Sequence, residues 1–440
     1  MTTETRQPTH AHRGRRRLWT VGPAVLIALA ILITLKATSL SGLPEVGEPF
    51  DIDEFARPIP DEVNAFTFYR RAFDKLGKDP TNPSGVWAGD WGSASADQRR
   101  WLGTNREALA IWREGTARPD ALYISPREMN VATVLPVIQG MRSFGRLAIL
   151  EATRLEAAGD LNGALDWYLA VLRSSRHCGR RGVPIERLVG IALGAMASSR
   201  ISAMATDPDV DSTMLRRALD AAIEAESMTP PSSVSFKGEY LIFLNTMADP
   251  AFEDPAKLIP LVGRTHTWNW SSSGPGRAFF QAERSLKREP ERSRRVFRLV
   301  IANWLAYCDR PRSTRPPFAK LTPPPGPTPP GAAAGFELYA PEADAPDAVK
   351  ALSPEDLARW FHTTIYAEIL APNFAAMDRA LKRDRSTFGS LLITLANELH
   401  KREKGEYPAS VESLVGPYLR TIPEGYVPID GPVDEKPKGP

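Results

Sequence analysis

The sequence contains very little cysteine. Its 440 residues include only Cys178 and Cys308, which excludes a Cys-rich metal site and a framework of several disulfides. One disulfide between them can form in an oxidising compartment, whereas two buried free thiols fit the sequence equally well. The cysteines therefore leave the compartment open.

The chain also lacks a strong excess of charge of either sign. Its formal net charge is +3, and the positive excess is concentrated before position 18. The arginines there are Arg6, Arg13, Arg15, Arg16 and Arg17. Because a nucleic-acid-binding surface needs a basic face that displaces counterions, we expect no nucleic acid among the partners.

Motifs of the common enzyme classes are absent as well. The histidines are His10, His12, His177, His266, His362 and His400. None belongs to an HExxH motif or to a paired metal-ligand spacing, and the chain has no P-loop, dinucleotide fingerprint or GxSxG elbow. His177 and Cys178 are neighbours, but successive helical residues point about 100° apart, so they predict no dyad. We therefore predict no catalytic residue, cofactor or metal, although a carboxylate pair assembled between helices leaves no motif.

One long hydrophobic run is present near the N-terminus. Leu18–Leu35 contains no charged residue and would span roughly 27 Å as a helix, enough for a slightly thinned bilayer core. The preceding arginines favour a cytoplasmic tail at residues 1–17, with everything after Lys36 exported. A cleaved signal peptide is the alternative, but the run is long for one and KATSLSGLPE offers no clear cleavage site. We predict a single-span membrane anchor at residues 18–35.

Beyond this run the chain has the composition of an ordinary globular protein. It is 42% hydrophobic and 24% charged, and helical periodicity dominates. We expect a helix opened by Pro60 and Asp61, another over Asp97–Glu114, and a helical hairpin from Leu147 to Leu172 with its turn at Gly159 and Asp160. The sequence therefore predicts an all-α fold.

The hairpin resembles one tetratricopeptide repeat. Gly159, Ala164, Tyr168 and Leu172 occupy the family's small, small, aromatic and apolar positions. An earlier segment has the same pattern at Ala65, Tyr69 and Ala72. Ala65 and Ala164 lie 99 positions apart, which is not a multiple of the 34-residue period, so we expect irregularly stacked hairpins rather than a regular repeat array.

The next segments are interpreted as structural. Pro184 suits the first turn of a helix, and the uncharged stretch between Arg187 and Arg200 is too short to span a membrane, which favours a core helix. The acidic residues Asp207, Asp209 and Asp211 begin like a calcium loop. Ser212 and Ala218 stand where that loop needs Gly and Glu, so the acidic residues more plausibly cap the following helix.

Periodicity weakens between Pro230 and Gly276, where Trp268 and Trp270 fall in an expected loop. Exposed tryptophans can hold a partner or a sugar, whereas tryptophans more often fold back over a core. They are the candidate partner-binding residues of the sequence. A basic helix is expected from Arg284 to Tyr307, with its arginines facing solvent or anionic lipid.

A proline-rich segment divides the exported part. Residues 311–346 include LTPPPGPTPPG, a composition typical of a semi-rigid spacer. It separates a helical domain at residues 45–310 from a C-terminal helical region at residues 347–440.

The C-terminal region is expected to begin with Ser353 as N-cap and Pro354 in the first turn. A helix through FGSLLITLANELHKREK should end at Gly405 in a left-handed C-cap. We expect Tyr407 to pack beneath that end, and Ser410 to cap a short helix, VESLVGPYL.

This ending resembles the soluble segment that follows the long helix of type II secretion pseudopilins. The matching residues are Gly405, Tyr407, Pro408, Leu414, Val415, Tyr418, Leu419, Ile422 and Pro423. The pilin N-terminal start, with its processing glycine and fifth-position glutamate, is missing. The chain as a whole is similar to uncharacterised bacterial signal-anchored helical proteins with a G-x-Y-P ending, a resemblance that implies no activity.

The sequence thus favours a membrane-anchored, extracytoplasmic helical scaffold or protein-interaction module of the cell envelope. Its expected partners are the membrane and other envelope proteins. The alternative is an envelope hydrolase with a site assembled between helices, for which convergent carboxylates or histidines in a polar cleft would be required.

Overall fold

The computed structural model describes residues 40–79, 90–250, 288–321, 337–343, 345–350, 353–362 and 374–424, together with a few isolated positions. The predicted membrane helix at residues 18–35 lies almost wholly outside this part of the chain. Trp268, Trp270 and the middle of the proline-rich segment, residues 322–336, also lie outside it.

The described residues form helices, and their only β-type pairings are three isolated bridges, which confirms the predicted all-α class. The shorter elements are α2 (Ile52–Phe55), α3 (Ala65–Asp74), α4 (Ala96–Thr104), α5 (Arg106–Thr116), η1 (Pro126–Glu128), η3 (Arg312–Thr314), α14 (Asp347–Lys350), α15 (Pro354–His362) and η4 (Val411–Leu414). The longer helices are α6 (Pro136–Ala157), α7 (Leu161–His177), α8 (Pro184–Ala205), α9 (Ser212–Ser227), α10 (Ser232–Ala248), α13 (Glu289–Tyr307) and α17 (Phe374–Lys404).

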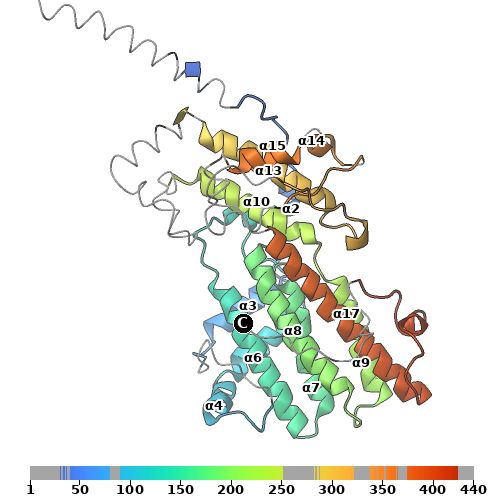
Figure 1. The fold of residues 1–440 in the computed structure, drawn as a ribbon. Coiled ribbons are helices and arrows are strands. Elements are labelled where there is room, and N and C mark those ends of the chain that lie inside the picture. The colour runs from blue at the N-terminus through green and yellow to red at the C-terminus, as the bar shows by residue number, and fades with distance from the viewer. Residues whose placement is uncertain are drawn as a thin grey trace, which may run out of the picture.

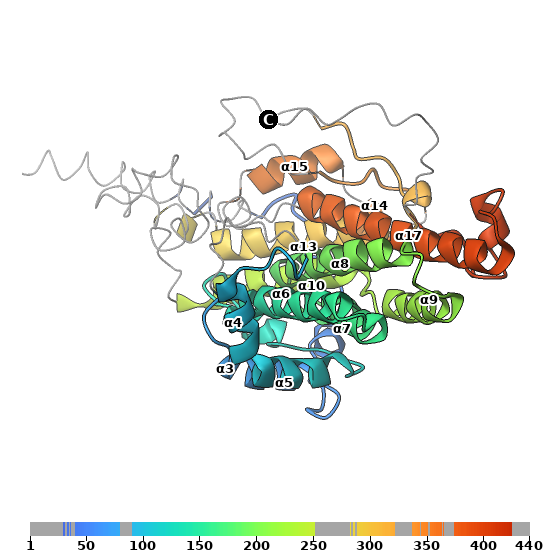
Figure 2. The same cartoon turned by 90° about the horizontal axis from the view of Figure 1, so that it is seen from below.

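The larger of two hydrophobic clusters lies within the bundle of α3 to α9, and the C-terminal half of α17 completes it. Its centre is the predicted hairpin: α6 and α7 pack against each other, and α8 then packs against both. The turn falls at Gly159 as expected, and Asp160 caps α7 through its side chain. Figure 2 shows α3 and α5 on one side of this hairpin and α8 and α17 on the other.

The second cluster lies between α10, α13, α14, α15 and the first turns of α17. Aromatic rings are packed together in it, with Phe297 stacked on Phe243 and Trp304 tilted against Phe374. The described ends of the proline-rich segment also belong here. Asn303 exchanges two hydrogen bonds with the backbone of Tyr339, and the Trp304 ring lies against Phe318.

The helix α17 connects the two clusters (Figure 1). Its first turns place Phe374, Met377 and Leu381 in the second cluster, and from Phe388 onward it packs along α8 and α9 in the first. The predicted division of the chain at residues 311–346 therefore stays a prediction. The helix α17 follows this proline-rich segment in the sequence, yet it packs against helices that precede the segment.

One helix of the described chain is long and apolar enough to cross a membrane, and that helix is α8. Half of its most apolar window is buried inside the protein. It begins with Pro184 in its first turn, as predicted, and packs against α6, α7, α10 and α17. These contacts place it as the central helix of the bundle.

Two expected elements differ from the structure, and one observed helix was not expected. The helix expected to open at Pro60 begins at Ala65, because Asn64 supplies the capping side chain. The helix expected over Asp97–Glu114 breaks at Asn105, whose side chain accepts from the Gly77 amide and donates to the Trp101 carbonyl. The helix that was not expected is α10, which lies where the periodicity of the sequence is weak.

The C-terminal ending is partly as expected. Gly405 has φ +84°, the left-handed conformation predicted for the C-cap. Tyr407 does not pack beneath the helix end, since 53% of it is exposed and its hydroxyl instead donates to Glu398. The expected short helix is a 3₁₀ turn, η4, without a side-chain cap from Ser410. Leu414, Tyr418 and Leu419 are the residues of this segment that are buried.

Candidate functional site

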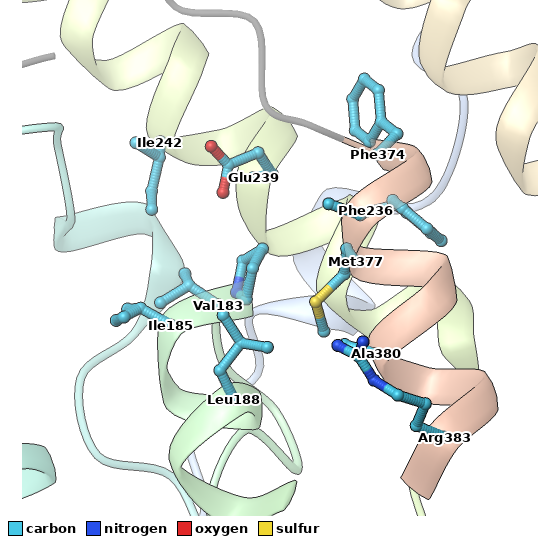
Figure 3. Close-up of a pocket in the computed structure, with 12 residues that line it drawn as sticks. Val183, Ile185, Leu188, Phe236, Glu239, Ile242, Phe374, Met377, Ala380 and Arg383 are labelled. Carbon is cyan, nitrogen blue, oxygen red and sulfur yellow. The ribbon is translucent and has the colours of Figure 1, made fainter. Parts of the chain in front are cut away.

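An apolar cavity lies where the start of α8, the middle of α10 and the first turns of α17 meet. Its volume is about 460 Å³, within the usual range of ligand pockets. Figure 3 shows its lining, which consists of Val183, Pro184, Ile185, Leu188, Phe236, Glu239, Ile242, Phe374, Ala376, Met377, Ala380 and Arg383. We call this cavity the apolar groove.

Helical spacing explains why these side chains share one cavity. On α10 the lining residues Phe236, Glu239 and Ile242 are separated by three positions, which places them on one face. The same spacing occurs along α17, from Phe374 through Met377 and Ala380 to Arg383. Each helix therefore contributes one stripe to the groove.

A close approach of two backbones holds α10 against the start of α8. A Cβ atom on Gly238 would lie 2.5 Å from the carbonyl oxygen of Gly182, closer than real Cβ contacts. Because Gly238 has no side chain, α10 can cross in direct contact with the turn before α8. This crossing places the next residue, Glu239, at the groove.

The groove is open on the α8 side. Ile185 is 42% exposed and Leu188 is 38% exposed, although both are large aliphatic residues. Adjacent exposed aliphatic side chains at the mouth of an apolar cavity are typical of a surface that another molecule covers.

Glu239 is the acidic residue of the groove. It is partly buried, and desolvation raises the pKa of its carboxyl to about 7. Arg383 is the basic residue of the lining and is exposed. Figure 3 shows the carboxylate on the side where Ile242 and Val183 lie, with Arg383 at the other end. The groove can therefore bind an apolar group and a charged one together, but its lining offers neither histidine nor a nucleophile.

A second cavity, the polar cleft, lies between the ends of α7 and α9 and the middle of α17. Its volume is about 410 Å³, and its charged lining residues are Arg176, Glu226, Asp309, Asp384, Arg385 and Glu424. Most of these charges are already matched within the protein. Asp384 binds both Arg176 and Arg187, and Glu424 binds Arg385.

The pair of arginines on Asp384 is deeply buried. The side chains of Arg176 and Arg187 are each 1% exposed, and that of Asp384 is 5% exposed. Burial lowers the pKa of Arg187 to about 10 despite the opposing effect of Asp384. The Arg176 guanidinium also lies over the Phe388 ring at 4.3 Å. This network joins α7, α8 and α17, and we interpret it as structural.

Among the described residues, the neighbours His177 and Cys178 are both held in the core. His177 is buried between the Tyr69 hydroxyl, at 2.7 Å, and the Arg118 carbonyl, at 2.9 Å, and desolvation lowers its pKa to about 4. Burial raises the pKa of Cys178. Cys178 and Cys308 are both free and buried, which decides between the two alternatives for the cysteines.

Metal-ligand geometry is not found in the described chain, where no three His, Cys, Asp or Glu side chains converge. Asp211 caps α9, as predicted. The candidate partner-binding residues Trp268 and Trp270 fall outside the described residues. Their position relative to the groove is therefore not described.

The comparisons with known proteins return nothing: no family model, curated protein or solved structure matches this chain. The sequence interpretation missed Ile185, Leu188 and Glu239. Ile185 and Leu188 could have been found from their position beside Glu186 and Arg187 at the start of an otherwise apolar helix, whereas no sequence signal marks Glu239.

Proposed function

We propose that this chain is a membrane-anchored, extracytoplasmic helical scaffold that binds another envelope protein through the apolar groove. The observation that supports the proposal is the exposure of Ile185 and Leu188 beside a preformed cavity. Protein-interaction sites characteristically pair such apolar anchors with a small number of charged groups. The anchor at residues 18–35 would hold the groove near the membrane surface.

Site-specific crosslinking in cells tests this binding role. A photo-reactive phenylalanine derivative at position 188 of the full-length chain should give an adduct with a discrete envelope protein. The same group at position 134 is the matched control, because Val134 is an apolar residue that is 78% exposed and lies outside the groove lining. Adding Ile185→Asp should remove the adduct from position 188.

Two results would contradict the proposal. One is an equal adduct from positions 188 and 134, which would indicate non-specific collision. The other is the complete absence of adducts from position 188 when the protein is abundant in the envelope.

The hydrolase alternative would use the polar cleft. Glu226 is a carboxyl there whose pKa is raised by burial, as a general acid requires. The neighbouring acids Asp384 and Glu424 are held by arginines, and Asp309 accepts a hydrogen bond from the Ser233 amide. We therefore regard the groove as the better-supported site.

A further inference from the structure

Neither charged side chain of the apolar groove has a partner in the part of the chain that the structure describes, and this is unusual for Glu239 because it is partly buried, whereas Arg383 is exposed. Glu239 and Arg383 line the groove and form no hydrogen bond or ion pair with any described residue. Charged groups beside apolar surface are normally paired, since desolvation penalises an isolated charge.

Neighbouring acids show what the protein does elsewhere. Glu48 accepts from Tyr240 and pairs with Arg298, and Glu45 pairs with Arg295. Glu45 and Glu48 lie in the segment before α2 and contact residues of α10 and α13, the helices around Glu239. Within the described chain, Glu239 lacks the counter-charge that these two carboxylates have, as does the buried Glu186 on α8.

Cations on the surrounding elements are directed elsewhere. Lys237 lies on the opposite side of α10, over the rings of Phe50 and Phe55. Arg298 on α13 is held by Glu48, and Arg127 on η1 pairs with Asp53. On α8, Arg187 is held by Asp384. Arg383 is the charged residue that shares the lining with Glu239.

Building on the function proposed above, we propose that the occupant of the groove is an amphipathic peptide segment of the partner protein. It would insert apolar side chains beside Ile185, Leu188 and Met377 and place a lysine or arginine against Glu239. Arg383 favours an acidic residue at the other end of the same segment. A cavity of about 460 Å³ holds a few anchor side chains, so the segment lies across the opening, as in helix-in-groove recognition.

The pairing makes binding depend on pH in a defined direction. The pKa of Glu239 is about 7 in the free protein, whereas an ion pair needs the ionised carboxylate. Affinity should therefore rise as pH increases from 5.5 to 8, by up to about tenfold per pH unit below the pKa. Glu239→Gln should remove this dependence.

Peptide selection tests the inference on the full-length protein held in lipid nanodiscs, which avoids detergent in the groove. A phage-displayed library of random peptides is selected on the wild type, Glu239→Gln, Glu239→Lys and Leu188→Asp. Wild type should enrich apolar peptides containing Lys or Arg, and Glu239→Lys should enrich Asp or Glu instead. Leu188→Asp should enrich neither. Glu128→Gln, which changes an exposed carboxyl outside the groove, should select as wild type does.

The best peptide is then titrated by fluorescence anisotropy. Glu239→Gln should weaken its binding about 10- to 100-fold at pH 8, with unchanged melting temperature as the check on folding. Replacing the peptide's cation by glutamine should have the same effect on wild type and almost none on the variant.

The outcomes separate this inference from the proposed function. Selection of apolar peptides without a preference for Lys or Arg would overturn the inference and leave the groove as a binding site. Absence of any peptide that depends on Leu188 would overturn both. A lipid that co-purifies with wild type but not with Leu188→Asp, or a crosslink from position 188 to a second copy of the chain, would assign another occupant and also overturn the inference.

Discussion

Asp384 is the residue whose removal should cost most, because it is the shared counter-ion of two buried arginines. We predict that Asp384→Asn lowers the free energy of unfolding by about 3–5 kcal/mol, since it leaves two buried guanidiniums without a charge partner. Denaturant melting of the full-length protein measures this. Asp220→Asn, an exposed carboxylate on α9, should change stability by no more than about 0.5 kcal/mol. Equal effects of the two substitutions would show that the buried network contributes little.

Glu186 gives the fold a pH dependence of predictable sign. Desolvation raises the pKa of this buried carboxyl from 4.5 to about 8. Between these values the folded protein retains a proton that the unfolded chain releases, so this contribution to stability is complete below about pH 4.5 and is lost as pH rises through 8. His177, with its pKa lowered to about 4, acts in the opposite direction below pH 6.5.

Because Glu186 and His177 act in opposite directions, the effect of Glu186 is measured as the difference in stability between wild type and Glu186→Gln at each pH. From pH 6.5 to 8 the stability of wild type should fall by on the order of 1 kcal/mol per pH unit relative to Glu186→Gln. Thermal melting at half-unit pH steps checks it. Parallel profiles for the two proteins would mean that Glu186 is ionised throughout this range.

At the scale of elements, the crossing of α10 over the start of α8 depends on Gly238. We predict that Gly238→Ala costs about 1–3 kcal/mol because its new methyl group overlaps the Gly182 carbonyl. Gly103→Ala on α4 is the control, since a methyl group there meets nothing within 4 Å and alanine is the better helix former, by up to about 1 kcal/mol. Opposite shifts in melting temperature are expected. Two stabilised variants would show that the crossing adjusts without strain.

The same elements show how far the sequence predicts the fold. The α6–α7 hairpin was predictable because its stripe, its turn glycine and its Asp160 cap are all local signals. The break at Asn105 was not, since the Gly77 amide that binds its side chain lies in another segment. The helix α10 was missed because it buries residues in the aromatic cluster on one face and lines the groove on another, which removes its amphipathic periodicity.

The groove itself could not be predicted from local patterns. It is assembled from three segments separated by long stretches of chain, and its acidic residue carries no motif. Sequence reasoning identified the apolar character of α8 and of the second half of α17, from Phe388 onward, but neither the first turns of α17 nor the point where the helices meet. Tyr407 shows the converse error, in which a local pattern suggested burial and the structure leaves the ring 53% exposed.

At the scale of the whole molecule, the arginines before Leu18 predict that the N-terminus is cytoplasmic and the helical bundle is exported. A reporter active only outside the cytoplasm, fused after Pro440 of the full-length chain, should be active, and a cytoplasmic reporter at the same point should be silent. Reversing Arg15, Arg16 and Arg17 to glutamate should weaken this bias. The opposite pattern of reporter activity in the unaltered chain would refute the orientation.

The position of α17 in the chain has a consequence for biosynthesis. The helix spans both hydrophobic clusters, and it follows every other helix of those clusters in the sequence except the η4 turn. A ribosome therefore releases more than 370 residues before Asp384 can neutralise Arg176 and Arg187. Until then both cores remain open along the surface that α17 will cover. A chain that ends before this helix would therefore expose apolar surface of both clusters and leave two arginines without a counter-ion. Proteases and chaperones recognise incompletely folded proteins by such features.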